Sequence, residues 1–310
     1  MNASANSLYD VVVIGGGGAG LTAALYTSRA KLTTLLLEKL VPGGQIALTD
    51  IVENYPGFPE GITGGEIAQR MEDQAKRYGT QVAYEPAERI TQNADLFEIK
   101  TSGSAYRART IILAAGASFR TIGVRGEKEL TGRGVSYCAT CDGAFFKEKK
   151  IAVVGGGDSA MQEGIFLTRF ASEVNVIHRR DKLRASPILQ DRARQNPKIK
   201  FIWNTVVEEV RGEKKVQELL LRNLKEGRDY AFAADGVFVF IGHEPNTAFL
   251  KGFVELDEKG YVRTDTGLAA SVPGVFAAGE IRTGAVKQLV AACGEGCQAA
   301  LAAQAYLEHA

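Results

Sequence analysis

Residues 9–20 read YDVVVIGGGGAG, and residues 150–160 read KIAVVGGGDSA. In both places a short apolar run rich in β-branched residues leads into a glycine turn, as a buried parallel strand does before a helix. A segment of helical composition follows each turn, LTAALYTSRA (21–30) and MQEGIFLTRF (161–170). A second apolar run then ends at Glu38 in the first copy and at His178 in the second. The chain therefore contains the same strand–turn–helix–strand unit twice.

The glycines of this unit have separate physical roles. Gly15 makes the sharp turn, Gly17 lets the backbone approach a pyrophosphate at the helix N-terminus, and Gly20 lets the helix pack on its strand. Two ordinary glycine-rich loops are the alternative, but they would have to occur twice in the same register. We predict an α/β protein with two Rossmann-like, three-layer dinucleotide-binding domains. The residues predicted to contact a dinucleotide are Gly15, Gly17, Gly18, Ala19 and Gly20 in the first turn, and Gly155, Gly157, Asp158, Ser159, Ala160 and Glu163 in the second.

The two copies differ at the end of their second strand. Glu38 lies about 20 residues after the first glycine, where a carboxylate accepts hydrogen bonds from ribose hydroxyls. Its counterpart is His178, which is followed by Arg179, Arg180 and Arg184. Guanidinium groups bind a 2′-phosphate that a carboxylate would repel. The first turn therefore suits FAD and the second NADPH, with a solvated basic helix start as the alternative reading of HRRDKLR.

Further candidate flavin contacts are spread along the chain, and each taken singly is also compatible with an ordinary loop. The strand-like run TIILAAGA (110–117) ends in small residues, and VFAAGE (275–280) repeats that pattern before a small-residue helix. This return predicts that residues 1–117 and 246–310 form one FAD-binding domain, with residues 118–245 inserted as the NADPH-binding domain. The candidate flavin contacts are Gly44, Gln45, Asn54, Ala115, Gly116, Gly279, Glu280, Lys287 and Gln288.

A Cys-x-x-Cys pair, Cys138 and Cys141, precedes the second turn and is followed by Asp142. Such pairs commonly have a thiol of lowered pKa, which suits them to disulfide exchange. Asp142 is placed to exchange a proton with the thiols, or is a surface carboxylate. Zinc is disfavoured, because a structural site needs four ligands and the chain has only three histidines. We read Cys293 and Cys297 as small buried residues of a helix and predict no metal.

Composition excludes several functional classes. The 310 residues carry 37 basic and 36 acidic side chains, so charge gives no reason to expect nucleic acid or an anionic membrane as a partner. There is no apolar run of about 18 residues and no signal-peptide pattern at the N-terminus. With only four cysteines in 310 residues, we expect a cytoplasmic protein.

Together the motifs GGGGAG, CATCDG, GGGDSA, HRRxxxR, IGHEPNT and FAAGE resemble those of the low-molecular-weight, bacterial-type thioredoxin reductases. The resemblance covers residues 8–308. It implies a homodimer with one FAD per subunit, in which NADPH reduces FAD, FAD reduces the Cys138–Cys141 disulfide, and the dithiol reduces thioredoxin. It also implies that Cys141 faces the flavin, that Cys138 is the interchange thiol and that Asp142 is the acid–base residue.

Three positions depart from the family pattern. Gly18 stands where proline is frequent, Glu280 replaces the aspartate that meets the flavin ribityl chain, and Lys287 replaces an arginine. Lysine provides a point charge without the planar guanidinium fork. Three alternatives stay open: a related disulfide reductase with another dithiol partner, one with another electron donor such as ferredoxin, and a flavin-binding redox sensor.

Overall fold

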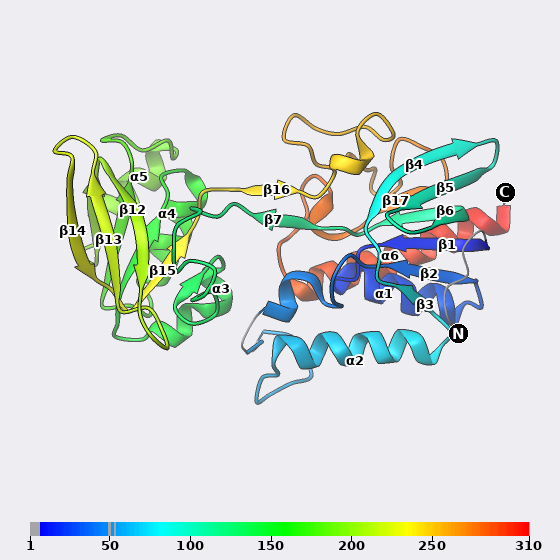
Figure 1. The fold of residues 1–310 in the computed structure, drawn as a ribbon, viewed down its shortest axis with the longest axis horizontal. Coiled ribbons are helices and arrows are strands. Elements are labelled where there is room, and N and C mark those ends of the chain that lie inside the picture. The colour runs from blue at the N-terminus through cyan, green and yellow to red at the C-terminus, as the bar shows by residue number, and fades with distance from the viewer. Residues whose placement is uncertain (1–6, 49–50, 53, 310) are drawn as a thin grey trace. The chain divides into compact units, whose positions relative to one another are not determined.

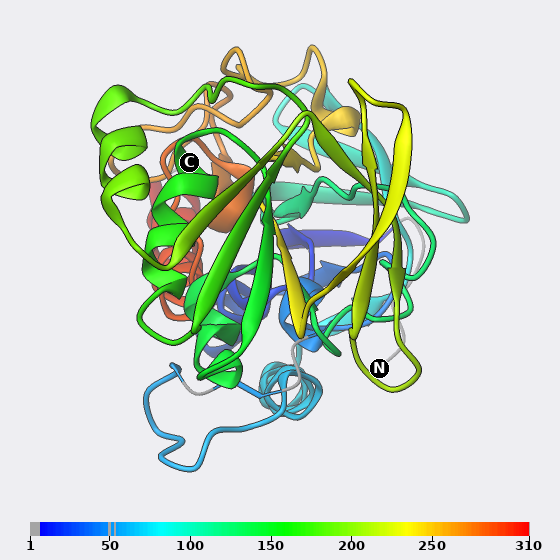
Figure 2. The ribbon, with the colours of Figure 1, turned by 90° about the vertical axis from the view of Figure 1, so that its left-hand side faces the viewer.

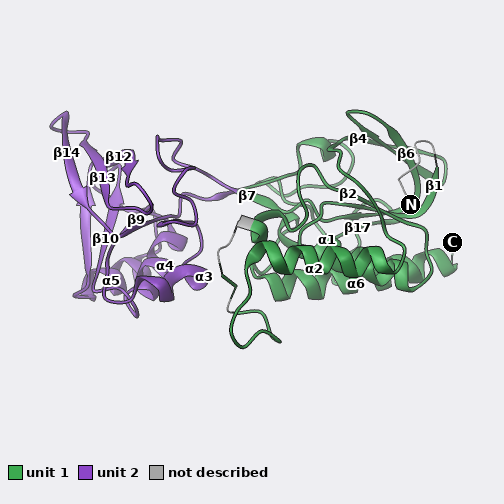
Figure 3. Ribbon diagram, turned by 60° about the horizontal axis from the view of Figure 1, so that its bottom comes forward, with its two compact units in different colours: residues 1–118, 244–310 green, residues 119–243 purple. Residues whose placement is uncertain are grey.

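The computed structural model describes residues 7–48, 51–52 and 54–309. The chain forms two compact units, Met1–Ser118 with Glu244–Ala310, and Phe119–His243 (Figure 3). It crosses between them twice, through β7 (Ala117–Phe119) and β16 (His243–Pro245), which pair with each other. The divisions lie close to the predicted boundaries after residues 117 and 245. The cofactor that each unit binds stays a prediction.

The first unit is built on a sheet in the order β3-β2-β1-β6-β5-β4, with β17 paired to β6 (Figure 1). β1, β2, β3, β6 and β17 are parallel, whereas β4 and β5 form an antiparallel hairpin. Along one edge of β6 the first residues pair with β5 and the last with β17. The strands are β1 (Leu8–Ile14), β2 (Thr34–Leu37), β3 (Gln81–Ala83), β4 (Ala87–Asn93), β5 (Leu96–Thr101), β6 (Ala105–Leu113) and β17 (Val275–Ala277).

Both faces of this parallel sheet are covered, which is why its strands are almost entirely apolar. Val11 and Val13 of β1 pack with the three helices of the unit, α1 (Gly18–Arg29), α2 (Gly64–Arg77) and α6 (Leu289–His309). Val12 and Ile14 point to the opposite core, formed with β4, β5 and the segment 249–281. Short 3₁₀ turns complete the unit: η1 (Gly44–Leu48), η3 (Ala248–Leu250) and η4 (Gly279–Ile281).

The second unit repeats this plan around a parallel sheet in the order β11-β10-β9-β15-β8. Helices cover one face, and an antiparallel sheet of β12, β13 and β14 covers the other (Figure 2). The elements are β8 (Val135–Ser136), α3 (Ala139–Asp142), η2 (Gly143–Phe146), β9 (Lys150–Val154), α4 (Asp158–Leu167), β10 (Glu173–His178), α5 (Pro187–Gln195), β11 (Ile199–Trp203), β12 (Thr205–Arg211), β13 (Glu218–Asn223), β14 (Arg228–Ala233) and β15 (Gly236–Val239). The predicted α/β fold with two three-layer units is confirmed.

Among the described residues, no helix has both the length and the apolar character that crossing a bilayer requires.

Candidate functional site

The first glycine turn lies between β1 and α1, as predicted. Gly15 has φ +108°, and a Cβ there would lie 2.4 Å from the carbonyl oxygen of Ala114. A Cβ on Gly20 would lie 1.7 Å from the Gly15 oxygen, so both positions exclude a side chain. Gly17 is different, because a Cβ there would meet nothing nearer than 4.0 Å. The packing of the protein does not require glycine at position 17, whereas a closely approaching pyrophosphate would.

The second turn, between β9 and α4, follows the same pattern. A Cβ on Gly155 would lie 2.5 Å from the Phe240 oxygen, and one on Gly157 would meet nothing within 4 Å. Gly157 therefore corresponds to Gly17 in its open surroundings as well as in sequence. Both turns leave a strip of bare backbone at a helix N-terminus, which is the arrangement that binds phosphate groups.

Glu38 and His178 occupy equivalent places beside the two turns. The Glu38 carboxylate is buried and accepts hydrogen bonds from the backbone N–H groups of Gly16 (2.7 Å) and Leu40 (3.0 Å). The His178 ring is buried against Gly156, and its Nε2 donates to the Lys182 carbonyl at 3.1 Å. Burial lowers the pKa of His178, and the neighbouring arginines lower it further. The structure therefore places a carboxylate beside the first glycine turn and an imidazole beside the second, in equivalent positions.

The arginines predicted to bind a 2′-phosphate lie on a loop that is fixed to the second turn. The backbone N–H groups of Arg184 (2.7 Å) and Ala185 (3.1 Å) both donate to the Gly156 carbonyl. Asp158, in the first turn of α4, accepts a hydrogen bond from the Ser186 N–H at 2.6 Å. The side chains of Arg179, Arg180 and Arg184 are exposed. The backbone thus presents three solvent-accessible guanidinium groups near the N-terminus of α4.

On the first unit, several predicted flavin contacts are brought together from distant parts of the sequence. The Gln45 side chain donates to the Ala117 carbonyl, and Asn54 donates to Gln288 Oε1 at 3.0 Å. Asn246, which we did not predict, donates from its side chain to the Ala115 carbonyl (2.8 Å) and from its backbone to the Gly116 carbonyl (3.0 Å). Its motif IGHEPNT was noticed, but no local pattern connects it with residues 115–116.

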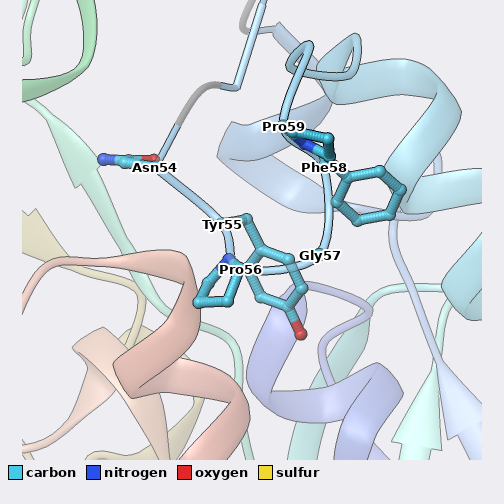
Figure 4. Close-up of a pocket in the computed structure, with 6 residues that line it drawn as sticks. All are labelled: Asn54, Tyr55, Pro56, Gly57, Phe58 and Pro59. Atoms are coloured by element: carbon cyan, nitrogen blue, oxygen red, sulfur yellow. The ribbon is translucent and has the colours of Figure 1, made fainter.

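Asn54 also begins the loop Asn54–Pro59, which lines a cavity of about 430 Å³ (Figure 4). The pKa of the Tyr55 hydroxyl of this loop is raised to about 12, first by burial and then by the thiol of Cys293 in α6. Cys293 is buried and Cys297 is partly exposed, and neither forms a disulfide. Both thiols belong to α6, as predicted, but only Cys293 is buried, so the expectation of a buried side chain was wrong for Cys297.

Glu280 is the most informative residue of this region. Its Oε2 is the single buried side-chain oxygen or nitrogen without a hydrogen-bond partner among the residues that the structure describes. Burial raises the pKa of Glu280, although the positive charge of Lys287 partly opposes this. Burial also lowers the pKa of Lys287. A buried polar atom without a partner is costly unless a ligand satisfies it. A ligand hydroxyl, such as those of a ribityl chain, fits this requirement.

Cys138 and Cys141 form a disulfide with an S–S distance of 2.06 Å and a Cα–Cα distance of 5.3 Å. Cys138 lies immediately before the short helix α3, and its sulfur accepts from the Cys141 N–H at 3.2 Å. Both cysteines are partly exposed, and Asp142 is half-buried at the end of the same turn. The predicted redox disulfide is present, while the proton-transfer role of Asp142 remains a prediction.

The residue before this disulfide is firmly held, which the sequence did not indicate. The Tyr137 hydroxyl donates to Glu127 Oε1 at 2.9 Å, and its ring stacks on Phe119 at 5.0 Å. Glu127 is buried and also accepts from the N–H groups of Ile122 and Gly123. Burial raises the pKa of Tyr137, and the Glu127 carboxylate raises it further. These contacts fix the approach of the chain to Cys138.

Comparison with known families agrees with this geometry. Residues 9–296 match the family described as pyridine nucleotide-disulphide oxidoreductase. The chain belongs to this family. Within it, the chain is 49% identical over 306 residues to the thioredoxin reductase of Bacillus subtilis, covering 98% of this chain and 96% of that protein. It is 48% identical over 310 residues to the thioredoxin reductase of Listeria innocua, covering 99% and 96%.

Solved structures of this oxidoreductase family give the same result. The crystal structure of thioredoxin reductase from Streptococcus pyogenes is 43% identical, with a TM-score of 0.94 over 98% of this chain and 100% of that one. The thioredoxin reductase from Giardia duodenalis is 36% identical, with a TM-score of 0.91 over 98% and 100%. The resemblance to thioredoxin reductases found in the sequence is confirmed.

Proposed function

We propose that the protein is an NADPH-dependent thioredoxin-disulfide reductase that holds one FAD per subunit. The Cys138–Cys141 disulfide is the observation that carries this proposal, because it lies in the same unit as the basic dinucleotide turn. Arg179, Arg180 and Arg184 would bind the 2′-phosphate of NADPH. We place FAD at the turn of Gly15–Gly20, with Glu38 at its ribose and Glu280 at its ribityl chain.

FAD, when bound, supplies a two-electron relay between a hydride donor and a disulfide. The chain's own residues then carry out the exchange. Two electrons and two protons convert the Cys138–Cys141 disulfide into a dithiol, and Asp142 exchanges one of the protons. The Cys138 thiolate attacks a disulfide sulfur of oxidised thioredoxin and forms a mixed disulfide. The Cys141 thiolate next attacks Cys138 Sγ, which releases reduced thioredoxin and restores the disulfide.

We propose thioredoxin as the substrate because the similar proteins are named thioredoxin reductases. We further expect a homodimer in the cytoplasm. A related reductase that serves another dithiol protein, or one that takes electrons from ferredoxin, has the same disulfide and is the second candidate.

The test is steady-state turnover of the purified flavoprotein with oxidised thioredoxin and either NADPH or NADH. We expect turnover with NADPH to be strongly preferred. A flavoprotein that reduces thioredoxin with neither nucleotide would contradict the proposal, and activity with reduced ferredoxin would favour the second candidate.

The arginine variants test the nucleotide site separately. A charge-assisted hydrogen bond contributes about 1.5–3 kcal/mol, so Arg179→Ala or Arg180→Ala should raise KM for NADPH at least about tenfold while KM for NADH changes little. Arg192→Ala, an exposed arginine on α5, is the matched control and should change neither value. Equal use of both nucleotides by the unaltered protein would refute the assignment of the second turn.

A further inference from the structure

Arg282 and Glu295 form a largely buried ion pair beside the predicted flavin site. Their side chains are only 19% and 14% exposed. The guanidinium binds the carboxylate in a bidentate manner, with Nη2 donating to Oε1 and Nε donating to Oε2 at 2.8 Å. Such a fork fixes orientation as well as charge. Neither residue was singled out from the sequence.

Glu295 has a second contact that gives the pair a specific position. Its Oε2 also accepts the backbone N–H of Gly279 at 2.7 Å. Gly279 begins the turn η4, has φ +75°, and a Cβ there would lie 3.0 Å from the Ala19 side chain. Ala19 belongs to the first turn of α1, beside the glycine turn. One carboxylate of α6 therefore fixes the start of η4 against the dinucleotide-binding helix.

The next residue of η4 is Glu280, whose buried Oε2 has no partner. The cation whose charge acts on this carboxylate is Lys287. Arg282 lies two residues further along the chain, but its Nε and Nη2 are bound to Glu295 and its Nη1 donates to the Thr283 carbonyl at 3.2 Å. All three of its nitrogens are thus engaged elsewhere.

We propose that Glu295 and Arg282 are positioning residues of the flavin site, which fix η4 and keep the guanidinium away from the Glu280 carboxylate. Glu280 is then left to bind a ribityl hydroxyl of FAD. This inference rests on the proposed function, since it requires that the first unit bind a flavin.

The experiment compares Glu295→Gln with the double variant Glu295→Gln/Arg282→Met. Titration of each apoprotein with FAD, followed by flavin fluorescence, gives Kd, and thermal unfolding of the apoprotein gives Tm. In the single variant the glutamine oxygen can still accept the Gly279 N–H, but Arg282 loses its charged partner, and we expect its guanidinium to turn toward Glu280. We expect Kd to rise at least about tenfold, because FAD must then displace a charge-assisted hydrogen bond from Glu280.

The double variant has no guanidinium to capture Glu280. We therefore expect its Kd to return to within about threefold of the unaltered protein, a rescue that a merely structural role would not give. Asp229→Asn, which breaks the exposed bidentate pair with Arg222 in the other unit, is the matched control and should leave Kd unchanged.

A single variant that binds FAD as tightly as the unaltered protein overturns the inference, and so does a double variant as weak as the single one. If Glu295→Gln does not fold, which its Tm would show, the double variant alone tests the inference. A Kd for FAD more than about threefold above that of the unaltered protein then overturns it. Failure of the unaltered apoprotein to bind FAD would instead refute the proposed function, so the two failures are distinguishable.

Discussion

At the scale of single residues, Glu280 is where function and stability oppose each other. A buried carboxylate oxygen without a hydrogen-bond partner, like its Oε2, destabilises the protein unless a ligand satisfies it. Because the folded state raises the pKa of Glu280 above its ordinary value of 4.5, the folded protein holds this proton more tightly than the unfolded chain does. The stabilisation that results is fully present below pH 4.5 and is lost as pH rises through the raised pKa.

Glu280→Gln is therefore expected to stabilise the apoprotein at pH 8 and to have little effect near pH 4. A gain of about 1 kcal/mol is the low end for an unsatisfied buried group and corresponds to a rise in Tm of about 2–4 °C. Thermal unfolding of the apoprotein at the two pH values checks this, with the exposed Glu258→Gln as control. An equal Tm shift at both pH values would mean that ionisation of Glu280 is not the cause.

Candidate site residues could be found from the sequence where they lie at a fixed distance along a recognisable motif. Glu38, His178 and the Cys138–Cys141 pair are of this kind, because each lies at a fixed distance from a strand or from its partner. The contacts of Asn246 with residues 115–116, and of Arg282 with Glu295, were not predictable. They depend on which loop or turn folds against which strand end or helix, and no local spacing encodes that.

At the scale of secondary structure, the close approach of α1 and α6 depends on small residues. A Cβ on Gly296 of α6 would lie 2.1 Å from the carbonyl oxygen of Ala19, whereas one on Gly294 would meet nothing within 4 Å. Two glycines of the same helix, two residues apart, therefore have opposite surroundings. This gives a matched pair of substitutions.

Gly294→Ala should stabilise the protein by about 0.5–1 kcal/mol, since alanine favours the helix and meets no neighbour. Gly296→Ala should destabilise it by about 1–3 kcal/mol through overpacking, and should weaken FAD binding because Ala19 lies in the first turn of α1. Thermal unfolding and FAD titration of both variants measure these effects. Similar Tm values for the two variants would show that α1 and α6 do not pack as described.

The parallel strands β1, β2, β6, β9, β10 and β17 were predictable, because each is a continuous apolar run. The parallel strands β3, β8, β11 and β15 were not identified from the sequence. The antiparallel strands β4, β5 and β12–β14 were not identified from the sequence. In β5, β12 and β13, exposed or half-buried positions separate the buried ones, whereas β4 has one buried residue and β14 has none. Such short alternating runs give a weaker pattern than the continuous apolar runs of β1 or β10.

At the scale of the whole molecule, the order of the motifs along the chain implies that the two units move relative to each other during the reaction. Cys141 and the second glycine turn belong to the inserted unit, and the first glycine turn belongs to the other. Hydride transfer needs reacting atoms at about 3–3.5 Å. The dithiol must also leave its electron donor to meet a macromolecular disulfide. We therefore expect rotation of the inserted unit about the two crossings at β7 and β16.

Fixing the two units with a photocleavable cross-linker should abolish thioredoxin turnover while sparing one of the half-reactions. Stopped-flow measurement of flavin reduction by NADPH and of dithiol formation separates the two steps. Illumination that cleaves the linker should restore turnover, which controls for chemical damage. Full turnover by the cross-linked protein would rule out the rotation.

The most direct test of electron transfer to the disulfide is an anaerobic titration with NADPH, followed by flavin absorbance. The unaltered protein should take up about two equivalents per chain, because the flavin and the disulfide each accept two electrons. Cys138→Ser and Cys141→Ser should each take up about one equivalent, whereas Cys293→Ser/Cys297→Ser should still take up about two. Uptake of about one equivalent by the unaltered protein, or about two by the Cys138 and Cys141 variants, would contradict the assignment of the redox centre.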